Sequence, residues 1–349
     1  MISSHIAAGS PGSSTFSFNL VPSYVKLPDG TEGLLVRSVN SSAGQCYGGT
    51  MQCDKQGTCN GGEHCSAHGA STALNPDYIT FTRYRGGKLA DPDDAALEPI
   101  TDANIVLVPN RSAGSPEECG VQDPRIVFNK DTGLYVLAYT TFGFAEQSPN
   151  GPIPQYTCGG GGAGLGIATS KDPSDPNGWT RHGYDQLGKS AALLVRETGP
   201  HYAFFGIPAI NMARSHDLVK WENITWNWMI NDDDFSGFIE AGGPPVRMED
   251  GNYLFSYNIL GPCNCWGAGY AILDGDDPSV VIQRESGIIW PELPWETVNA
   301  SNPGTAWEPM KCCIGATNSI QPLGGNEFLA HYVTGDSVSG GSILTVEPR

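Results

Sequence analysis

Short apolar runs separated by turn residues dominate the chain, and no long segment repeats its apolar residues with helical periodicity. Runs rich in Val, Ile, Tyr, Phe and Thr alternate with clusters of Gly, Pro, Asn and Asp, which is typical of many short strands joined by turns. The clearest predicted strands are residues 34–37, 78–84, 126–128, 134–139, 202–206, 253–257 and 328–332. The pattern therefore predicts an all-β protein.

The strands also repeat. An aromatic-rich run is followed by a run of small residues and then by a Trp or a polar run, as in residues 135–139, 164–170 and Trp179. Antiparallel repeats of roughly 40 to 70 residues are typical of propeller blades. About five such blades fit into one domain over residues 18–349, after an N-terminal extension of residues 1–17. A two-sheet sandwich is the alternative, but it does not explain the recurring Ala-x-Ser, Asp, Trp order.

Composition supports one large β unit and restricts the partners. The 349 residues include 45 Gly and 26 Pro, and only 16% are charged. The net charge of -18 argues against nucleic acid and anionic membrane as partners, because both attract basic surfaces. A neutral sugar fits this charge better. No apolar run is long enough to span a bilayer, and residues 1–14 show no recognisable signal peptide.

Ten cysteines are many for a cytosolic enzyme of this size, and their even number suggests disulfides. Four of them crowd a Gly-rich stretch, residues 41–73, which we interpret as a disulfide-stapled insertion. Zinc is a weaker alternative there, although His64 and His68 are close by, because the paired short-spaced Cys motif is absent. Together with four Asn-x-Ser/Thr sequons, the cysteines predict a secreted glycoprotein.

The segment Gln122-Asp123-Pro124-Arg125 places an acid beside a proline and an arginine, just before a predicted strand. Proline restricts the residue before it, so we expect Asp123 in a stiff, extended bend with Arg125 close enough to orient it. A carboxylate held in this way is a candidate for acid/base chemistry. The alternative is an Asp-Pro turn with a surface salt bridge.

An ordered series of short motifs extends these observations over residues 18–346. The series consists of Phe18-Asn19, residues 33–37, the Asp123 segment, Lys189-Ser190, and residues 202–206, 212–221, 239–246, 253–258, 269–274 and 331–336. In order and spacing it resembles glycoside hydrolase family 130, the five-bladed propellers that phosphorolyse or hydrolyse β-mannosides. The resemblance implies an enzyme without a metal or cofactor, acting on an oligosaccharide or glycan.

Glycoside cleavage uses two carboxyl groups, one as the acid and one as the base or nucleophile. The resemblance implies that Asp123 is the general acid, acting through a sugar hydroxyl, although Gln122 stands where the family usually has Glu. Glu240 resembles the hydrolytic type and would be the general base, unless it is a buried ion-pair partner of Lys189 or Arg247. Glu296 would be the second glutamate of the base, with Glu308 as its rival.

Polar residues of the same motifs would hydrogen-bond the sugar, namely Asn19, Arg37, Arg125, Lys189, Asn258 and Asp336. Tyr257, Trp266 and Trp295 are candidates for stacking on a sugar face. Together with the resemblance, these residues predict a secreted, inverting hydrolase of a β-mannoside or related glycan. The alternatives are an inverting β-mannoside phosphorylase and a glycan-binding propeller without catalysis.

Overall fold

The computed structural model describes residues 16, 18–39, 76–89, 97–112, 115–144, 158–185, 187–231, 238–260, 266–289, 314–334 and 338–346. Within these ranges the secondary structure is almost entirely β. The described helical turns are of the 3-10 type, η1 (Arg85–Gly87) and η3 (Asp102–Asn104). The predicted fold class is therefore confirmed. Except for Phe16, the N-terminal extension lies outside the described residues, as does the Cys-rich stretch 41–73.

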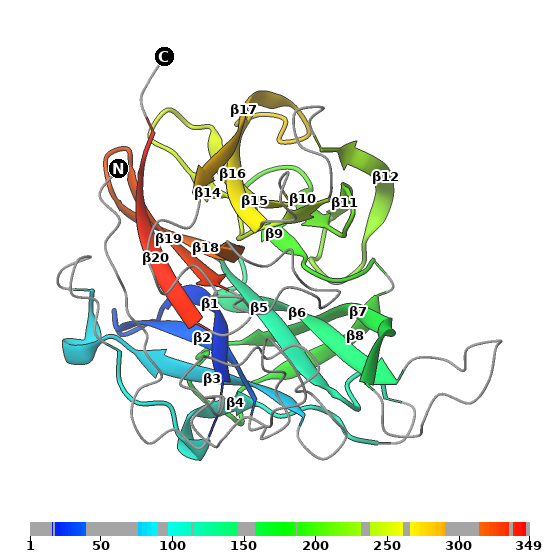
Figure 1. Ribbon diagram of the computed structural model, residues 1–349, viewed down its shortest axis with the longest axis vertical. Coiled ribbons are helices and arrows are strands. Elements are labelled where there is room, and N and C mark those ends of the chain that lie inside the picture. The colour runs from blue at the N-terminus through cyan, green and yellow to red at the C-terminus, as the bar shows by residue number, and fades with distance from the viewer. Residues whose placement is uncertain are drawn as a thin grey trace, which may run out of the picture.

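The described strands form four sheets, and the first, eight-stranded sheet consists of two consecutive antiparallel groups, so that we number five groups as blades (Figure 1). Blade 1 contains β1 (Phe18–Lys26), β2 (Glu32–Val39), β3 (Asp77–Arg83) and β4 (Ile105–Leu107). Blade 2 contains β5 (Gly120–Asn129), β6 (Leu134–Phe144), β7 (Cys158–Ser170) and β8 (Thr180–Asp185). Blade 3 contains β9 (Ala192–Leu194), β10 (His201–Phe205), β11 (Ile210–Ser215) and β12 (Glu222–Met229).

The last two blades follow the same plan. Blade 4 contains β13 (Ile239–Ala241), β14 (Val246–Arg247), β15 (Tyr253–Leu260), β16 (Trp266–Leu273) and β17 (Val281–Ile289). Blade 5 contains β18 (Ile314–Gly324), β19 (Glu327–Thr334) and β20 (Val338–Thr345). In blades 1, 3 and 5 the first strand lies at one edge of the sheet, and in blade 4 this edge is formed by β13 and β14. In blade 2 the first strand, β5, also pairs with β3 of blade 1.

The blades close into a ring. Strand β1 contacts β5 of the next blade, β5 contacts β9, and β15 contacts β18. Strand β18 and its neighbours in blade 5 contact β1, so the last blade meets the first beside it (Figure 1). The fold is a five-bladed β-propeller whose first strands surround the central axis, and not a two-sheet sandwich.

Blades 1 and 2 approach so closely that their ladders join. Asp77 at the start of β3 pairs in parallel with Gly120 at the start of β5. A Cβ atom at residue 120 would lie 2.7 Å from the main-chain nitrogen of Asp77, and the φ of Gly120 is 145°. Only glycine accommodates both conditions, so this position fixes how the two blades meet.

The hydrophobic core is divided into clusters between neighbouring blades. In β6, Leu137 faces the cluster shared with blade 1, whereas Ala138 faces the cluster shared with blade 3. Leu329 of β19 packs with Leu34 and Val36 of β2 and so seals the ring. Because both faces of a blade are buried, its middle strands are apolar at nearly every position, which explains the continuous apolar runs of the sequence. Truncating such a side chain to Ala typically costs about 2–5 kcal/mol.

The recurring Ser, Asp, Trp order marks turns between the outer strands. Ser215 Oγ donates to Asp217 Oδ1 at 3.1 Å and accepts from the Asp217 main-chain nitrogen at 3.2 Å. Ser170 accepts in the same way from the main-chain nitrogen of Asp172 at 3.1 Å. Trp221 follows the first of these turns and packs against the core between blades 2 and 3. The repeated Ser-x-Asp sequence therefore corresponds to the same kind of turn in blades 2 and 3.

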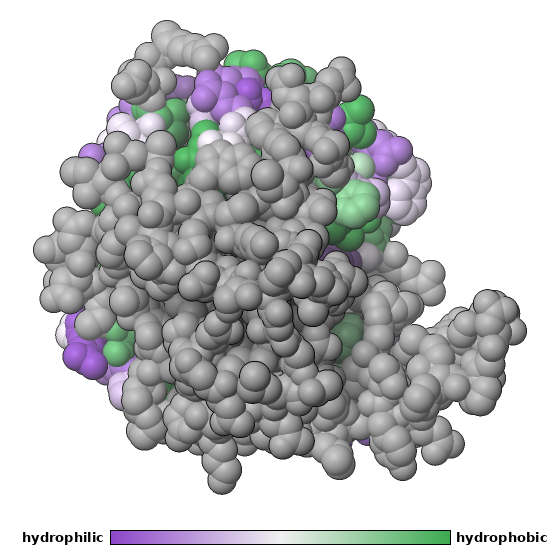
Figure 2. Space-filling view, in the orientation of Figure 1, coloured by the Kyte–Doolittle hydropathy of each residue, from purple (hydrophilic) through white to green (hydrophobic). Residues whose placement is uncertain are grey.

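The outer strands carry a more mixed surface. Along the upper edge of Figure 2, where Figure 1 places β12 and β17, hydrophobic and hydrophilic residues are interspersed. Trp226 of β12 is 63% exposed, and Ile282 of β17 is 53% exposed. None of the described segments forms a helix that is long and apolar enough to cross a membrane.

Candidate functional site

Asp123 lies inside β5, where the strand bulges. The pairing of β5 with β6 shifts between Gln122 and Arg125, and the φ of Asp123 is 51°. The predicted extended conformation of Asp123 is therefore wrong. The bulge places the residue in the left-handed region, which Asp tolerates better than most residues, and it re-aims the side chain out of the regular ladder. Strained backbone of this kind is typical of functional sites.

The carboxylate of Asp123 faces Arg37 of β2. Arg37 Nη1 lies 3.5 Å from Asp123 Oδ1, and Arg37 Nη2 lies 3.3 Å from Oδ2 of Asp77. Gln122 also donates a hydrogen bond to Asp77, whose side chain is fully buried. Arg37 is thus held between two carboxylates. Among the described residues, none bonds to Asp123 Oδ2, so this oxygen remains available for chemistry.

Glu240 lies in β13 on the same axis, and its side chain is 9% exposed. Lys189 Nζ lies 3.1 Å from Glu240 Oε1. The hydroxyl of Ser190 donates to the same oxygen. Within the described part of the chain, no residue bonds to Oε2. The buried ion pair considered for Glu240 therefore exists with Lys189 and not with Arg247, and it leaves the second oxygen open.

Arg125 crosses the centre of the propeller and is 1% exposed. Its Nε donates to the carbonyl of Gly242 at 2.6 Å, and its Nη2 donates to the carbonyl of Ala241 at 3.2 Å and to Oδ1 of Asn318 at 3.4 Å. Its Nη1 donates to the main-chain carbonyl of Asp123 at 3.3 Å, and not to the carboxylate.

Burial lowers the pKa of Arg125 from its usual value, while the charges of Asp123 and Glu240 oppose that shift. Both carboxylates therefore lie close enough to act electrostatically on this guanidinium. Its hydrogen bonds tie blade 2 to blades 4 and 5. Arg125 orients Asp123 through the backbone, and its role as a direct sugar ligand stays a prediction.

Two predicted sugar ligands are engaged with neighbouring strands. Asn19 Oδ1 accepts a hydrogen bond from Ser38 at 2.7 Å. Asn258 lies opposite Glu240 in the β13–β15 ladder, and its Oδ1 accepts from the main-chain nitrogen of Thr317 at 2.6 Å. Asn258 Nδ2 and Thr317 Oγ1 are buried without a hydrogen-bond partner among the described residues. Buried polar atoms are usually paired, so these two groups are candidates for contacts with a ligand.

Some predicted residues do not belong to this arrangement. Tyr257 is fully buried between blades 3 and 4, and its hydroxyl lies 2.8 Å from Ser286 Oγ and accepts from Arg284 Nε at 2.9 Å. The prediction that it stacks on a sugar is therefore wrong, because both faces of its blade are buried. The remaining predicted residues, Glu296, Glu308, Asp336 and Trp295, and the side chain of Trp266, lie outside the described residues.

Sequence reasoning missed three residues of the site. Ser190 follows Lys189 in the motif Lys189-Ser190. Its contact with Glu240 and its φ of 61° have no signal in the sequence. Asp77 and Thr317 are joined to the site only through contacts between strands that are distant in sequence. In the sequence, Asp77 stands out only as a polar residue at the start of an otherwise largely apolar strand.

Comparison with known proteins agrees with this geometry. The family model described as beta-1,4-mannooligosaccharide phosphorylase, Glyco_hydro_130, matches residues 95–302. A 1,2-beta-oligomannan phosphorylase from Thermoanaerobacter sp. (strain X514) is 32% identical over 51% of this chain and 55% of its own length. A beta-1,2-mannobiose phosphorylase from the same organism is 34% identical over 52% of this chain and 56% of its own length. The chain therefore spans about half the length of the curated relatives it matches.

A solved structure supports the fold over a longer stretch. It comes from a study of glycoside hydrolases in the GH130 family of mannoside phosphorylases, hydrolases that target beta-1,2 mannosidic linkages in Candida mannan. At 19% identity it covers 95% of this chain and 87% of its own, with a TM-score of 0.62. Because the family model spans more than half of the sequence, the chain belongs to glycoside hydrolase family 130.

Proposed function

We propose that this chain hydrolyses β-mannosidic linkages by single displacement, with Asp123 as the general acid and Glu240 as the general base. The main support for the proposal is that the two carboxylates have the same kind of surroundings. Each has one oxygen facing a cation, Arg37 or Lys189, and a second oxygen without a described partner. An inverting glycosidase needs two such groups, one to protonate the leaving oxygen and one to activate water.

The charge balance of the site favours water over phosphate as the nucleophile. The described site contains three cations, Arg37, Arg125 and Lys189, and each faces a carboxylate or main-chain carbonyls. Asp77, Asp123 and Glu240 supply three negative charges. A phosphate dianion needs excess positive charge, and Glu240 would repel it. Glu296, predicted as the second glutamate of the base, would add to this repulsion.

Gln122 is compatible with this mechanism. Its side-chain amide donates to the buried carboxylate of Asp77, which in turn faces Arg37. An ionised Glu at position 122 would lack that donor and would place a second negative charge against Asp77. We therefore interpret Gln122 as matched to Asp77, and not as a sign of lost catalysis.

Phosphorolysis is the second candidate, because two relatives are named as mannoside phosphorylases. Incubation with β-1,2- and β-1,4-mannobiose, with and without inorganic phosphate, separates the candidates. We expect free mannose at a rate independent of phosphate. Mannose phosphate formed only when phosphate is present would overturn hydrolysis, and binding without turnover would favour the glycan-binding alternative.

The role of Asp123 has its own test. Asn also tolerates a positive φ, so Asp123→Asn removes the acid with little backbone strain. An aryl mannoside, whose leaving group needs little protonation, should lose less activity than mannobiose. Equal losses on both substrates would argue that Asp123 only binds sugar.

We also propose that the protein works in an oxidising compartment outside the cytosol. Cys119, buried beside the start of β5, is disulfide-bonded. Alkylation without reductant followed by mass spectrometry should label fewer than half of the ten cysteines. Labelling of most of them would contradict a secreted protein.

A further inference from the structure

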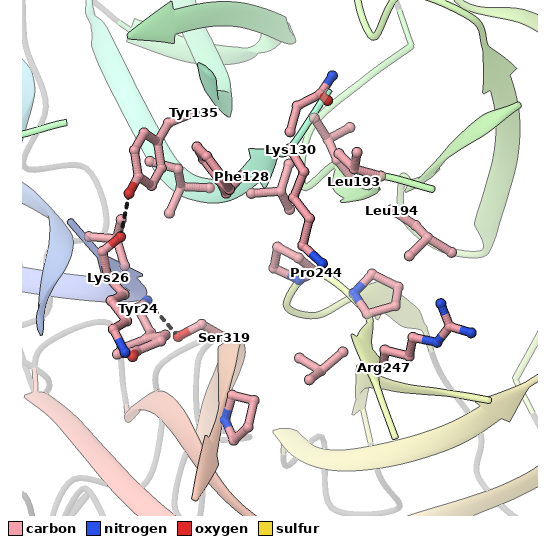
Figure 3. Close-up of a pocket in the computed structure, with 18 of the residues that line it drawn as sticks. Tyr24, Lys26, Phe128, Lys130, Tyr135, Leu193, Leu194, Pro244, Arg247 and Ser319 are labelled. Carbon is pink, nitrogen blue, oxygen red and sulfur yellow. Dashed lines mark hydrogen bonds between the residues drawn. The ribbon is translucent and has the colours of Figure 1, made fainter. Parts of the chain in front are cut away.

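A second opening lies at the other end of the propeller axis. On β5, Asp123 belongs to the site, whereas the last residues of that strand, 126–129, line a cavity of about 1010 Å³. The last residues of β1 and residues 244–247 of blade 4 line it as well. Arg125, buried between these ends, separates them. We call this opening the far cavity (Figure 3).

The walls of the far cavity are largely apolar. In Figure 3, Pro244 lies near the centre of the view, with Leu193 and Leu194 on one side and Phe128 and Tyr135 toward the other. Phe128 is 47% exposed, and its ring centroid lies 4.8 Å from that of Tyr135. The volume is at the upper end of small-molecule pockets, which are typically concave and apolar with few polar groups.

The rim of the far cavity is cationic, although the chain has 37 acidic and only 19 basic residues. Four cations line it, namely Lys26, Lys130, Arg196 and Arg247, against two carboxylates, Asp131 and Glu197. Lys130 pairs with Glu197 at 3.1 Å, and both side chains are exposed. Arg196 donates to the main-chain carbonyl of Asp276 at 2.7 Å and lies over the ring of Tyr202.

Lys26 and Arg247 have no carboxylate partner among the described residues. Glu32 lies opposite Lys26 in the β1–β2 ladder, but its carboxylate accepts instead from Tyr24 at 3.1 Å and from the main-chain nitrogen of Leu89 at 3.2 Å. In Figure 3 the two cations lie at the edge of the opening, on opposite sides of the apolar walls. In so acidic a chain, two cations without a described carboxylate partner at one apolar cavity point to an anionic ligand.

We propose that the far cavity binds a small organic anion with an apolar body, such as an aryl or alkyl carboxylate or sulfonate. The apolar walls would hold the body, and the cationic rim would hold the acidic group. This site is separate from Asp123 and Glu240, so the proposal does not depend on the proposed hydrolysis.

A matched pair of probes tests the charge requirement. Anilinonaphthalene sulfonate and its neutral parent phenylnaphthylamine share the same aromatic body and both fluoresce in apolar sites. We expect the sulfonate to bind saturably and more tightly than the neutral probe. Each partly exposed ion pair contributes little, so the double variant Lys26→Gln with Arg247→Gln should bind the sulfonate roughly two- to twenty-fold more weakly. Binding of the neutral probe should stay unchanged.

Two further variants complete the experiment. Lys220→Gln, at an exposed turn of blade 3, removes a cation away from the cavity and should leave both probes unaffected. Phe128→Asp changes a half-exposed wall residue and should weaken both probes, the sulfonate more. The proposal is overturned if the sulfonate binds the double variant as well as the wild type, or if both probes weaken equally in it. Turnover of mannobiose should be the same in the double variant as in the wild type.

Discussion

The two ends of the propeller axis are built from the same strands but differ in the balance between positive and negative side chains. At the end that holds Asp123 and Glu240, the described cations face carboxylates or carbonyls, and the polar atoms without a described partner belong to candidate catalytic groups or to candidate ligand contacts. At the far cavity the walls are apolar, and Lys26 and Arg247 have no carboxylate partner in the part of the chain that the structure describes. Balanced charge suits a neutral sugar, whereas unbalanced cations suit an anion.

Glu240→Gln should give the largest effect on turnover. Loss of a positioned base typically slows a reaction on the order of 10² to 10⁴-fold. The amide oxygen still accepts from Ser190 and Lys189, and Lys189 is 39% exposed, so the melting temperature should change little. Glu197→Gln at the far cavity removes an exposed ion pair and is the control, for which both quantities should stay unchanged. Unchanged turnover in Glu240→Gln would remove this residue from the mechanism.

Arg125→Met removes the buried guanidinium that lies between the two ends of the axis, and it should destabilise the fold. The change leaves the carbonyls of Ala241 and Gly242 without their donor and removes a nearby positive charge from Asp123 and Glu240. Breaking a buried charged contact typically costs about 3–5 kcal/mol. Denaturant unfolding measures this loss, and Lys130→Met, at the exposed pair with Glu197, should lose much less. Equal stability of Arg125→Met and wild type would contradict the central role of Arg125.

His331 should make the wall behind the far cavity sensitive to acid. Its ring stacks on Tyr24, which lines the cavity, and burial lowers its pKa from 6.5 to about 3. Between these values only the unfolded chain binds the proton, so stability is lost as the pH falls from about 6.5 toward 3. At about 1.4 kcal/mol per pH unit, the loss at pH 5 is roughly 2 kcal/mol.

His331→Gln keeps a polar side chain but cannot titrate, so it serves as the matched control. We expect its unfolding free energy to depend less on pH than that of the wild type between pH 6.5 and pH 4. Parallel pH profiles for the two proteins would show that other groups cause the acid sensitivity.

Thr317→Val should raise the stability of the fold slightly and weaken the binding of substrate. The buried hydroxyl has no described partner, so its replacement by an isosteric methyl should stabilise the fold by about 1 kcal/mol. If the hydroxyl contacts substrate, KM for mannobiose should rise severalfold. Thermal melting and steady-state kinetics measure the two effects. A raised melting temperature with unchanged KM would exclude Thr317 from the substrate site.

Much of the fold was predictable because blade strands bury both faces and leave long apolar runs, as residues 135–139 do. The pairing of Glu240 with Lys189 was among the possibilities considered from sequence. The bulge at Asp123, the buried network of Asp77 and the far cavity were not predicted. Each depends on how strands from different blades meet around the axis, and a linear pattern does not record that geometry.

The most direct test of the account is the identity of the first sugar released from β-1,2-mannobiose in phosphate buffer, followed by proton NMR. Inverting hydrolysis predicts that the mannose from the non-reducing end is released as the α anomer, so that α-mannose first exceeds its equilibrium share and then mutarotates. Turnover should have the same rate in phosphate-free buffer. Release of α-mannose 1-phosphate, with no turnover when phosphate is omitted, would contradict the assignment of Glu240 as a base that activates water.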